Sequence, residues 1–207
     1  MHGEFISFDG PEGTGKSTVC GEIVKIFSDK DILVVREPGS TPVGEKIRAI
    51  LKSKDLIEHI PGRAELFLFE AARACIIDQV INPALAAGKN VLCDRFFDST
   101  TAYQGYGREL DVDIEEMNML ATNFLSPSLT IFFDLPYEVG RARMAKRGQP
   151  TDRIEAAGEE FHNRVRHGFL SIAKLQPERC RVVNAEKSLD EVVSEVCSII
   201  KSKFGWN

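Results

Sequence analysis

The feature that most constrains this chain is a glycine-rich segment, GPEGTGKS, at residues 10–17. It follows an apolar run at residues 5–8 and precedes residues 18–27, whose apolar spacing predicts an amphipathic helix. The spacing matches the phosphate-binding P-loop, G-x-x-x-x-G-K-[ST], in the strand–loop–helix setting that this motif requires. The sequence therefore predicts a site for a nucleoside triphosphate.

The composition of the loop indicates how such a site would work. Gly10, Gly13 and Gly15 can adopt positive φ angles, so the backbone can wrap a phosphate chain with its N–H groups pointing inward. The N-terminus of the following helix adds a partial positive charge. We expect Lys16 to reach the β- and γ-phosphates and the Ser17 hydroxyl to bind Mg²⁺. The expected nucleotide-binding residues are Gly10, Pro11, Glu12, Gly13, Thr14, Gly15, Lys16, Ser17 and Thr18.

Length and charge narrow the possible functions. The 207 residues fit one domain, with room for a small mobile insertion. A net charge of −5 argues against a nucleic-acid surface, which is usually basic, so a phosphate site here needs locally clustered arginines. No apolar run approaches the ~20 residues of a membrane span, and the chain begins directly with the expected strand rather than with a signal peptide. We expect neither a nucleic-acid nor a membrane partner.

The cysteines and histidines form no metal-binding pattern. An odd number of widely spaced cysteines is typical of small buried residues in a reducing cytosol, so we expect a cytoplasmic protein. The histidines have no H-x-x-x-H or H-E-x-x-H spacing, and we assign them no chemistry. These residues are Cys20, Cys75, Cys93, Cys180, Cys197, His2, His59, His162 and His167.

Short apolar runs alternate with helical patterns along the chain, which predicts an α/β fold. Parallel strands joined by helical crossovers form a sheet that is covered on both faces. We expect residues 52–61 to be a polar loop, residues 98–107 to be a loop or a broken helix start, and Gly88 to end a long helix. Strands are expected at 5–8, 32–35, 90–93, 129–134 and 181–183, and helices at 18–27, 44–51, 62–87, 114–125, 137–147, 158–175 and 189–204.

Ligands of such sheets gather outside the carboxyl ends of the strands. This rule places Gly10, Arg36, Asp94, Arg95 and Asp134 along one edge of the sheet. The chain has no N-K-x-D motif for reading guanine, and it is shorter than is typical of ATP-driven motors. A compact phosphotransferase is the remaining interpretation, and its acceptor must be read from residues at this edge.

At this point the sequence resembles a known family, the thymidylate kinases. The motifs that carry the resemblance appear in the family's order between residue 5 and about residue 169: DGPEGTGKS (9–17), REPG (36–39), FEAAR (69–73), DR (94–95), YQG (103–105) and DRIE (152–155). The resemblance implies transfer of the γ-phosphate of ATP to dTMP with Mg²⁺, and a homodimer. It implies one domain over residues 1–207 with a P-loop NTPase-type three-layer sandwich, a five-stranded parallel sheet flanked by helices, and a small mobile lid at about 143–156.

The resemblance also assigns roles in binding dTMP. Phe69 and Arg73 lie four residues apart on one helix face, where a ring can stack on a pyrimidine and a guanidinium can donate to a base carbonyl. A core phenylalanine beside a solvated arginine is the alternative. By resemblance, Glu12 binds the 3′-hydroxyl and Tyr103 packs against the deoxyribose, where it would exclude a 2′-hydroxyl. Thr100 and Gln104 have counterparts that reach the base edge, although turn or capping roles fit them nearly as well.

Charged residues at the strand ends are expected to hold the phosphates and the metal ion. The guanidinium of Arg95 suits a phosphate that two substrates share, and the resemblance assigns this residue to the acceptor phosphate. Asp94 is the candidate for Mg²⁺ through water, with a capping role as the alternative. Arg36 and Arg48 are further candidates for gripping the monophosphate, and each could instead be a surface ion-pair partner.

A basic cluster surrounds a Gly-Gln-Pro segment at residues 148–150, and glycine and proline there favour a lid that closes over phosphates. One branch of the family carries a catalytic arginine in its glycine loop. This chain has none there and resembles the other branch, in which lid arginines supply the charge. Arg143, Arg147 and Arg153 are the expected catalytic arginines of the lid, alongside Lys16 and Arg95. Phe96 stands where many members of the family have Tyr or His, and Phe169 stands where Tyr is common. Both differences weaken any polar role at those positions.

Two other functions remain open from the residues alone. One is a kinase for another nucleoside monophosphate, such as UMP or CMP, or for a deoxynucleoside. The other is a non-catalytic nucleotide switch, against which a second-substrate pocket would argue. Phe69, Arg73 and Tyr103 favour a 2′-deoxypyrimidine acceptor.

Overall fold

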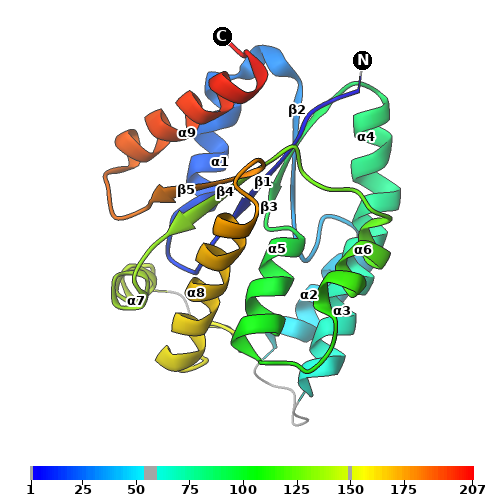
Figure 1. Cartoon of the computed structure of the whole chain (residues 1–207), viewed down its shortest axis with the longest axis vertical. Helices are drawn as coiled ribbons and strands as arrows, with labels where there is room; N and C mark the ends of the chain where they lie inside the picture. Colours follow the sequence, from blue (N-terminus) through cyan, green and yellow to red (C-terminus); the bar gives the residue numbers. More distant parts are fainter. Residues whose placement is uncertain (1, 54–59, 149–150) are drawn as a thin grey trace.

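Five parallel strands form the centre of the molecule, in the order β2-β3-β1-β4-β5 (Figure 1). We describe the chain from a computed structural model, which covers residues 2–53, 60–148 and 151–207. All five strands lie where the sequence predicted them. They are β1 (Phe5–Asp9), β2 (Ile32–Arg36), β3 (Asn90–Asp94), β4 (Leu129–Asp134) and β5 (Cys180–Asn184).

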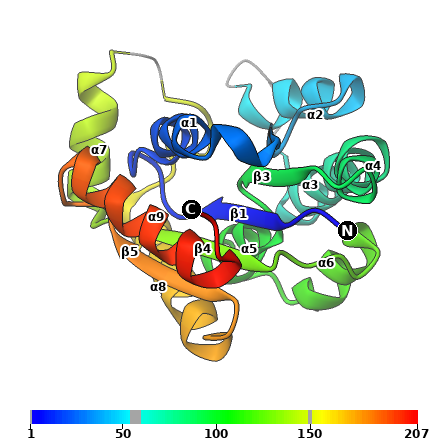
Figure 2. The same ribbon diagram turned by 90° about the horizontal axis from the view of Figure 1, so that it is seen from above.

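The sheet is buried on both faces because its side chains alternate between two apolar layers. On one face, Ile6 and Phe8 of β1 and Ile131 of β4 pack against α1 (Lys16–Ile26) and α9 (Leu189–Phe204). On the other face, Phe5 packs against α4 (Asn82–Ala86) and the helical turn before it, while Phe132 packs against α8 (Glu159–Leu175). Figure 2 shows the sheet between these helices, which makes the architecture the three-layer sandwich that the sequence predicted.

The helices follow the expected pattern with small shifts at their ends. They are α1 (Lys16–Ile26), α2 (Pro42–Lys52), α3 (Gly62–Ile76), α4 (Asn82–Ala86), α5 (Phe97–Thr100), α6 (Ile114–Thr122), α7 (Tyr137–Lys146), α8 (Glu159–Leu175) and α9 (Leu189–Phe204), with a short 3₁₀ turn η1 (Ser28–Lys30). Two π-helical stretches, η2 (Ile77–Ile81) and η3 (Thr101–Gly107), continue α3 and α5. The chain therefore stays helical from α3 through η2 to α4.

The structure corrects one local expectation and limits another. Residues 98–107 are neither a loop nor a broken start: α5 and η3 form one helical segment with a widened turn. The other widened stretch, η2, lies just before Pro83, which has no N–H to donate to the preceding turn. Of the expected polar loop at 52–61, residues 54–59 lie outside the described part of the chain. Gly88 has a φ of +81° just beyond α4, as expected for the end of this helix.

The parallel arrangement brings the carboxyl ends of β1, β2, β3 and β4 to one edge of the sheet. Asp94 of β3 pairs in register with Phe8 of β1 and with Arg36 of β2. Arg36, Asp94 and the glycine loop that follows β1 are therefore neighbours. Asp134 ends β4 and is held by Arg166 of α8 at 2.6 and 2.8 Å. Among the described helices, none combines the length and apolarity needed to cross a membrane.

Candidate active site

The glycine loop has the backbone that its sequence requires. Gly10, Gly13 and Gly15 have φ angles of +137°, +76° and +83°, all in the region that favours glycine. A Cβ on Gly10 would lie 2.5 Å from the Phe133 carbonyl oxygen, and one on Gly13 would lie 2.5 Å from the Gly140 carbonyl oxygen. The first of these glycines lets the loop leave β1 beside β4, and the second lets it touch α7.

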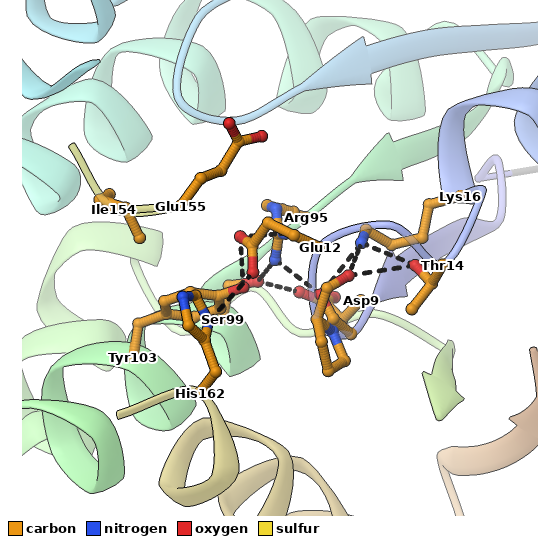
Figure 3. Close-up of polar contacts among 12 residues, drawn as sticks. Asp9, Glu12, Thr14, Lys16, Arg95, Ser99, Tyr103, Ile154, Glu155 and His162 are labelled. Atoms are coloured by element: carbon orange, nitrogen blue, oxygen red, sulfur yellow. Dashed lines mark hydrogen bonds and ion pairs between the residues drawn. The ribbon is translucent and has the colours of Figure 1, made fainter. Parts of the chain in front are cut away.

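Lys16 is folded over the loop and buried. Its Nζ donates to the carbonyl oxygens of Gly10 at 3.0 Å and Pro11 at 2.7 Å, and to Thr14 Oγ1 at 3.1 Å (Figure 3). Burial disfavours its charge and the nearby Arg95 adds to this effect, so the pKa of Lys16 falls to about 8. A phosphate anion at the loop would restore the charged form.

Ser17 and Asp94 place two oxygen ligands beside the loop. The Ser17 hydroxyl donates to Asp94 Oδ2 at 2.5 Å, which joins the first turn of α1 to the end of β3. No group of three or more metal-ligating side chains occurs in the described chain. A hydroxyl and one carboxylate suit Mg²⁺, which keeps several waters and takes its remaining oxygens from substrate phosphates.

Arg95 is held in a left-handed backbone conformation immediately after β3. Its φ is +74°, which is costly for a residue with a side chain and is fixed here by several contacts. Its Nη1 donates to the Gly10 carbonyl oxygen at 2.9 Å and to Ser99 Oγ at 3.2 Å. Buried Asp9 accepts from the Phe96 backbone N–H at 3.1 Å and from Ser99 at 2.6 Å, which secures the same turn.

Glu12 joins the loop to the opposite wall of the site. Its Oε1 accepts from Arg95 Nη2 at 3.0 Å and from the Tyr103 hydroxyl at 2.5 Å, and its Oε2 lies 3.6 Å from Nδ1 of His162. Burial alone would raise the pKa of Glu12, but Arg95, Lys16 and the Tyr103 hydroxyl outweigh it and lower the pKa. Figure 3 shows this carboxylate at the centre of the polar cluster.

Arg73 lies in a buried pocket of carboxylates that the sequence did not predict. Its guanidinium donates to Glu37 from Nε at 2.9 Å and to both Glu70 oxygens at 2.8 Å, and its Nη2 lies 2.8 Å from Glu37. Burial raises the pKa of Glu37 to about 7 although Arg73 opposes this effect. Arg73 is 2% exposed, so the alternative of a solvated arginine is wrong. Phe69 lies one turn away and is half-buried.

The segment α5–η3 supplies the wall that faces the glycine loop. Thr100, Tyr103 and Gln104 are all buried on it, and Arg95 lies over the Tyr103 ring at 5.1 Å. Gln104 donates from Nε2 to Glu65 at 2.8 Å. Phe96 and Phe169, the two departures from the family pattern, are core residues, since Phe96 packs on Phe5 and Phe169 on Tyr103 and Phe132.

The two remaining acceptor-site candidates lie on β2 and α2. Arg36 is exposed and forms an ion pair with Glu45 at 2.9 Å. This is the contact expected from the alternative interpretation of Arg36 as a surface ion-pair partner. Arg48 is half-buried and donates to the Pro38 carbonyl oxygen at 2.9 Å.

The arginines of the expected lid are each tied to a different part of the protein. Arg143 donates to the Ala185 carbonyl oxygen at 2.8 Å, and Arg147 pairs with Glu155 at 3.1 Å. Arg153 donates to the Leu51 carbonyl oxygen at 3.0 Å, and its Nη2 lies 2.6 Å from Glu65. Two residues of the Gly-Gln-Pro segment, 149 and 150, lie outside the described chain.

One cavity of about 450 Å³ brings most of the predicted residues together, a size ordinary for a small-molecule site. Gly10, Pro11 and Arg153 were predicted for the site but do not line this cavity in the described structure. Glu37 lines it and was missed, because only the fold reveals that it meets Arg73. The predicted residues that line the cavity are Glu12, Gly13, Thr14, Gly15, Lys16, Ser17, Thr18, Arg36, Arg48, Phe69, Arg73, Asp94, Arg95, Thr100, Tyr103, Gln104, Arg143 and Arg147.

A phosphate loop and an aromatic–arginine pocket in one cavity, on a parallel sheet covered on both faces, define a P-loop kinase. The sequence model of the family "Thymidylate kinase" matches residues 8–196. The chain belongs to the thymidylate kinase family.

Two similar relatives and a solved structure agree with this membership. The chain is 48% identical over 199 residues to a thymidylate kinase of Exiguobacterium sp., covering 95% of this chain and 93% of the relative. It is 42% identical over 209 residues to a thymidylate kinase of Lactobacillus delbrueckii subsp. bulgaricus, covering 99% and 98%. The crystal structure of thymidylate kinase from Ehrlichia chaffeensis superposes with a TM-score of 0.75 at 31% identity, covering 97% of this chain and 99% of that one.

Proposed function

We propose that this chain transfers the γ-phosphate of ATP to dTMP, giving dTDP and ADP in the synthesis of dTTP. The observation that carries the proposal is that one cavity is lined both by residues 12–18 of the P-loop and by Phe69, Arg73 and Tyr103. A nucleotide switch needs no such second pocket, and membership in the thymidylate kinase family supports the same acceptor.

The donor half of the site is the segment 10–18. Its backbone N–H groups and the N-terminus of α1 would hold the phosphates of ATP. Lys16 would exchange its three contacts with the loop for the β- and γ-phosphates, and the phosphates would in turn favour its charged form. Ser17 and Asp94 would hold Mg²⁺, Asp94 through water. When bound, this ion neutralises phosphate charge and fixes the geometry of transfer.

The acceptor half lies between α3 and the segment α5–η3. Phe69 would stack on the thymine ring, and Arg73 would donate to a thymine carbonyl, because Glu37 and Glu70 keep its guanidinium charged and fixed. Tyr103 would cover the deoxyribose and exclude a 2′-hydroxyl, with Glu12 at the 3′-hydroxyl. The remaining acceptor contacts are assigned to Arg36, Arg48, Arg95, Thr100 and Gln104.

The chemical step needs positioning and charge rather than a strong base. An oxygen of the ionised dTMP phosphate attacks the γ-phosphorus in line, the bond from that phosphorus to the β–γ bridging oxygen breaks, and ADP leaves. No proton has to be removed from the acceptor. Arg95 would stabilise charge on the phosphate that the two substrates share. We assign Arg143, Arg147 and Arg153 to the same task.

These arginines belong to a segment, residues 143–156, that we propose as the lid of a single domain spanning residues 1–207. Arg153 contacts Glu65 and Leu51 and would have to leave both to reach the phosphates. Arg143 and Arg147 already line the cavity. Closure of the lid would therefore have to break the contacts of Arg153 with Glu65 and Leu51.

We further propose a homodimer that works in the cytoplasm. Apolar side chains are exposed on α3 and at α6, which pack together: Phe67 is 59%, Leu120 75% and Phe124 76% exposed. Exposed apolar side chains of this size on two helices that pack together are typical of a protein–protein interface. A second copy of the same surface would cover them with the two-fold symmetry that is commonest among homo-oligomers.

Product analysis tests the proposed function. Purified protein, ATP and dTMP should yield equal amounts of ADP and dTDP by ion-exchange chromatography, and removing Mg²⁺ with a chelator should stop the reaction. ATP hydrolysis that is the same with and without dTMP would contradict the proposal.

A further inference from the structure

A buried carboxylate lies behind the wall of the cavity. Glu65 of α3 is 1% exposed and is not among the described cavity-lining residues. Its carboxylate nevertheless binds Gln104, which does line the cavity, together with two arginines, Arg108 and Arg153. Glu65 and Arg108 belong to none of the motifs that the sequence revealed, whereas Gln104 and Arg153 belong to the YQG and DRIE motifs.

The contacts of Glu65 fix its charge. Its Oε1 accepts from Gln104 Nε2 at 2.8 Å and from Arg108 Nε at 3.1 Å. Its Oε2 accepts from Arg108 Nη2 at 3.1 Å and lies 2.6 Å from Arg153 Nη2. Burial opposes ionisation, but Arg108, Gln104 and Arg153 outweigh it and lower the pKa of Glu65. Glu65 is therefore an ionised carboxylate at neutral pH.

An ionised carboxylate can only accept hydrogen bonds, and this fact orients the amide of Gln104. The NH₂ end of the amide must face Glu65, which leaves the amide oxygen as the part available to a ligand in the cavity. Arg73, on the same cavity, can only donate. A base in the cavity would therefore meet one donor, Arg73, and one acceptor, the Gln104 amide oxygen, and Glu65 determines the second of these.

We infer that Glu65 is a specificity-determining residue that acts through Gln104, making the site accept a pyrimidine with an N3–H donor and reject a cytosine. Thymine and uracil offer a carbonyl oxygen and an N3–H, which match Arg73 and the Gln104 oxygen. Cytosine offers an amino group and an unprotonated N3, which would oppose both. This inference rests on the proposed function and adds the means by which the base is selected.

The substitution Glu65→Gln tests this directly. The two donor-only arginines, Arg108 and Arg153, surround the Oε2 position, so the oxygen of the new amide should face them. Its NH₂ end would then face Gln104 and turn that amide over, which would present a donor to the base.

The best substrate pair is dTMP and 5-methyl-dCMP, because they differ only at the edge that Arg73 and Gln104 would read. We expect Glu65→Gln to lower the ratio of kcat/KM for dTMP to kcat/KM for 5-methyl-dCMP by at least about tenfold. Arg108→Met removes an ion pair with Glu65 but leaves the Gln104 contact, and it should keep the ratio of the unsubstituted protein. In a Gln104→Leu background, Glu65→Gln should no longer change the ratio.

A purely structural role for Glu65 would lower both kcat/KM values equally, and an unchanged ratio would overturn the inference. If Glu65→Gln does not fold, Glu65→Asp replaces it. The shorter side chain of aspartate should hold the Gln104 amide less firmly and lower the ratio of the two kcat/KM values severalfold. An unchanged ratio in this variant would also overturn the inference. Lack of dTMP turnover by the unsubstituted protein would instead refute the proposed function, so the two failures are distinguishable.

Discussion

Arg95 donates from Nη2 to Oε1 of Glu12 at 3.0 Å, joining the end of β3 to the glycine loop. The same guanidinium binds the Gly10 carbonyl oxygen, so its position depends on the loop that would hold ATP. The positive φ of Arg95 and its contacts with Gly10, Glu12 and Ser99 hold the guanidinium in one position before a ligand binds. This arrangement supports the proposal that Arg95 acts between the donor and acceptor halves of the site.

Removal of the Arg95 guanidinium should therefore affect catalysis more than folding. We expect Arg95→Met to lower kcat/KM for dTMP by about 10²- to 10³-fold, the size of effect seen when one charge-stabilising donor is lost. Arg95→Lys should have a kcat/KM between those of Arg95→Met and the unsubstituted protein, because an ammonium cannot bind a phosphate through two parallel hydrogen bonds. Steady-state kinetics give both values. Arg181→Met, at an exposed arginine on β5, is the control, and an equal loss there would contradict the role of Arg95.

Tyr103 combines a steric role with a hydrogen bond, and two substitutions separate them. Tyr103→Phe keeps the ring but removes the hydroxyl that donates to Glu12 at 2.5 Å, so it should slow dUMP turnover without admitting UMP. Tyr103→Ala removes the ring and should lower the ratio of kcat/KM for dUMP to kcat/KM for UMP by about tenfold or more. The measurement is kcat/KM for both acceptors in both variants. A preference for dUMP that survives in Tyr103→Ala would disprove the steric role.

The lowered pKa of Lys16 predicts that ATP binding depends on pH. Below a pKa of about 8 the ammonium is present in the empty loop, and above it the neutral amine predominates. Because ATP favours the charged form, Kd should increase by about tenfold between pH 7 and pH 9, with proton uptake on binding. Isothermal titration calorimetry in buffers of different ionisation enthalpy measures both quantities. Lys16→Met should bind weakly and lose this dependence, whereas the same dependence in that variant would assign it to another group.

The apolar residues at α6 predict how the oligomer can be broken. Leu120→Glu combined with Phe124→Glu should convert a homodimer to a monomer, because four charges would be buried at the symmetric interface. Size-exclusion chromatography with light scattering measures the mass. Leu175→Glu, at an equally exposed leucine at the end of α8, should leave the dimer intact. A monomeric unsubstituted protein, or a dimer that survives the double substitution, would refute this interface.

The sequence predicted the fold well because its signals are local. The glycine loop, the five apolar runs and the alternation of strands with helices all depend on neighbouring residues and on the general rules of parallel sheets. The widened helix at α5–η3 was harder, because its sequence contains two glycines and no regular apolar period. The sequence there indicated a loop or a broken helix start, whereas the segment packs against α8 as a helix.

The candidate site was predictable where the family motifs or a charged cluster pointed to it. Phe69, Arg73 and Arg95 could be found from short patterns, but the contacts of Glu37 and Glu65 are with partners far away in the sequence. Glu37 lies 36 residues from Arg73, and Glu65 lies 39 residues from Gln104. Glutamates are mostly exposed in folded proteins, so burial of these two carboxylates beside arginines, which only the fold reveals, is the observation that distinguishes them.

The measurement that tests the central claim most directly is a coupled ADP-release assay with ATP and Mg²⁺ over a panel of acceptors: dTMP, dUMP, UMP, CMP, dCMP, AMP and thymidine. We predict the highest kcat/KM for dTMP, a lower value for dUMP, and little activity with thymidine, which lacks the acceptor phosphate. Equal or higher values with UMP or CMP would contradict the roles of Phe69, Arg73 and Tyr103. If the protein binds ATP but releases no ADP with any of these acceptors, the result would contradict the assignment of the chain as an active kinase.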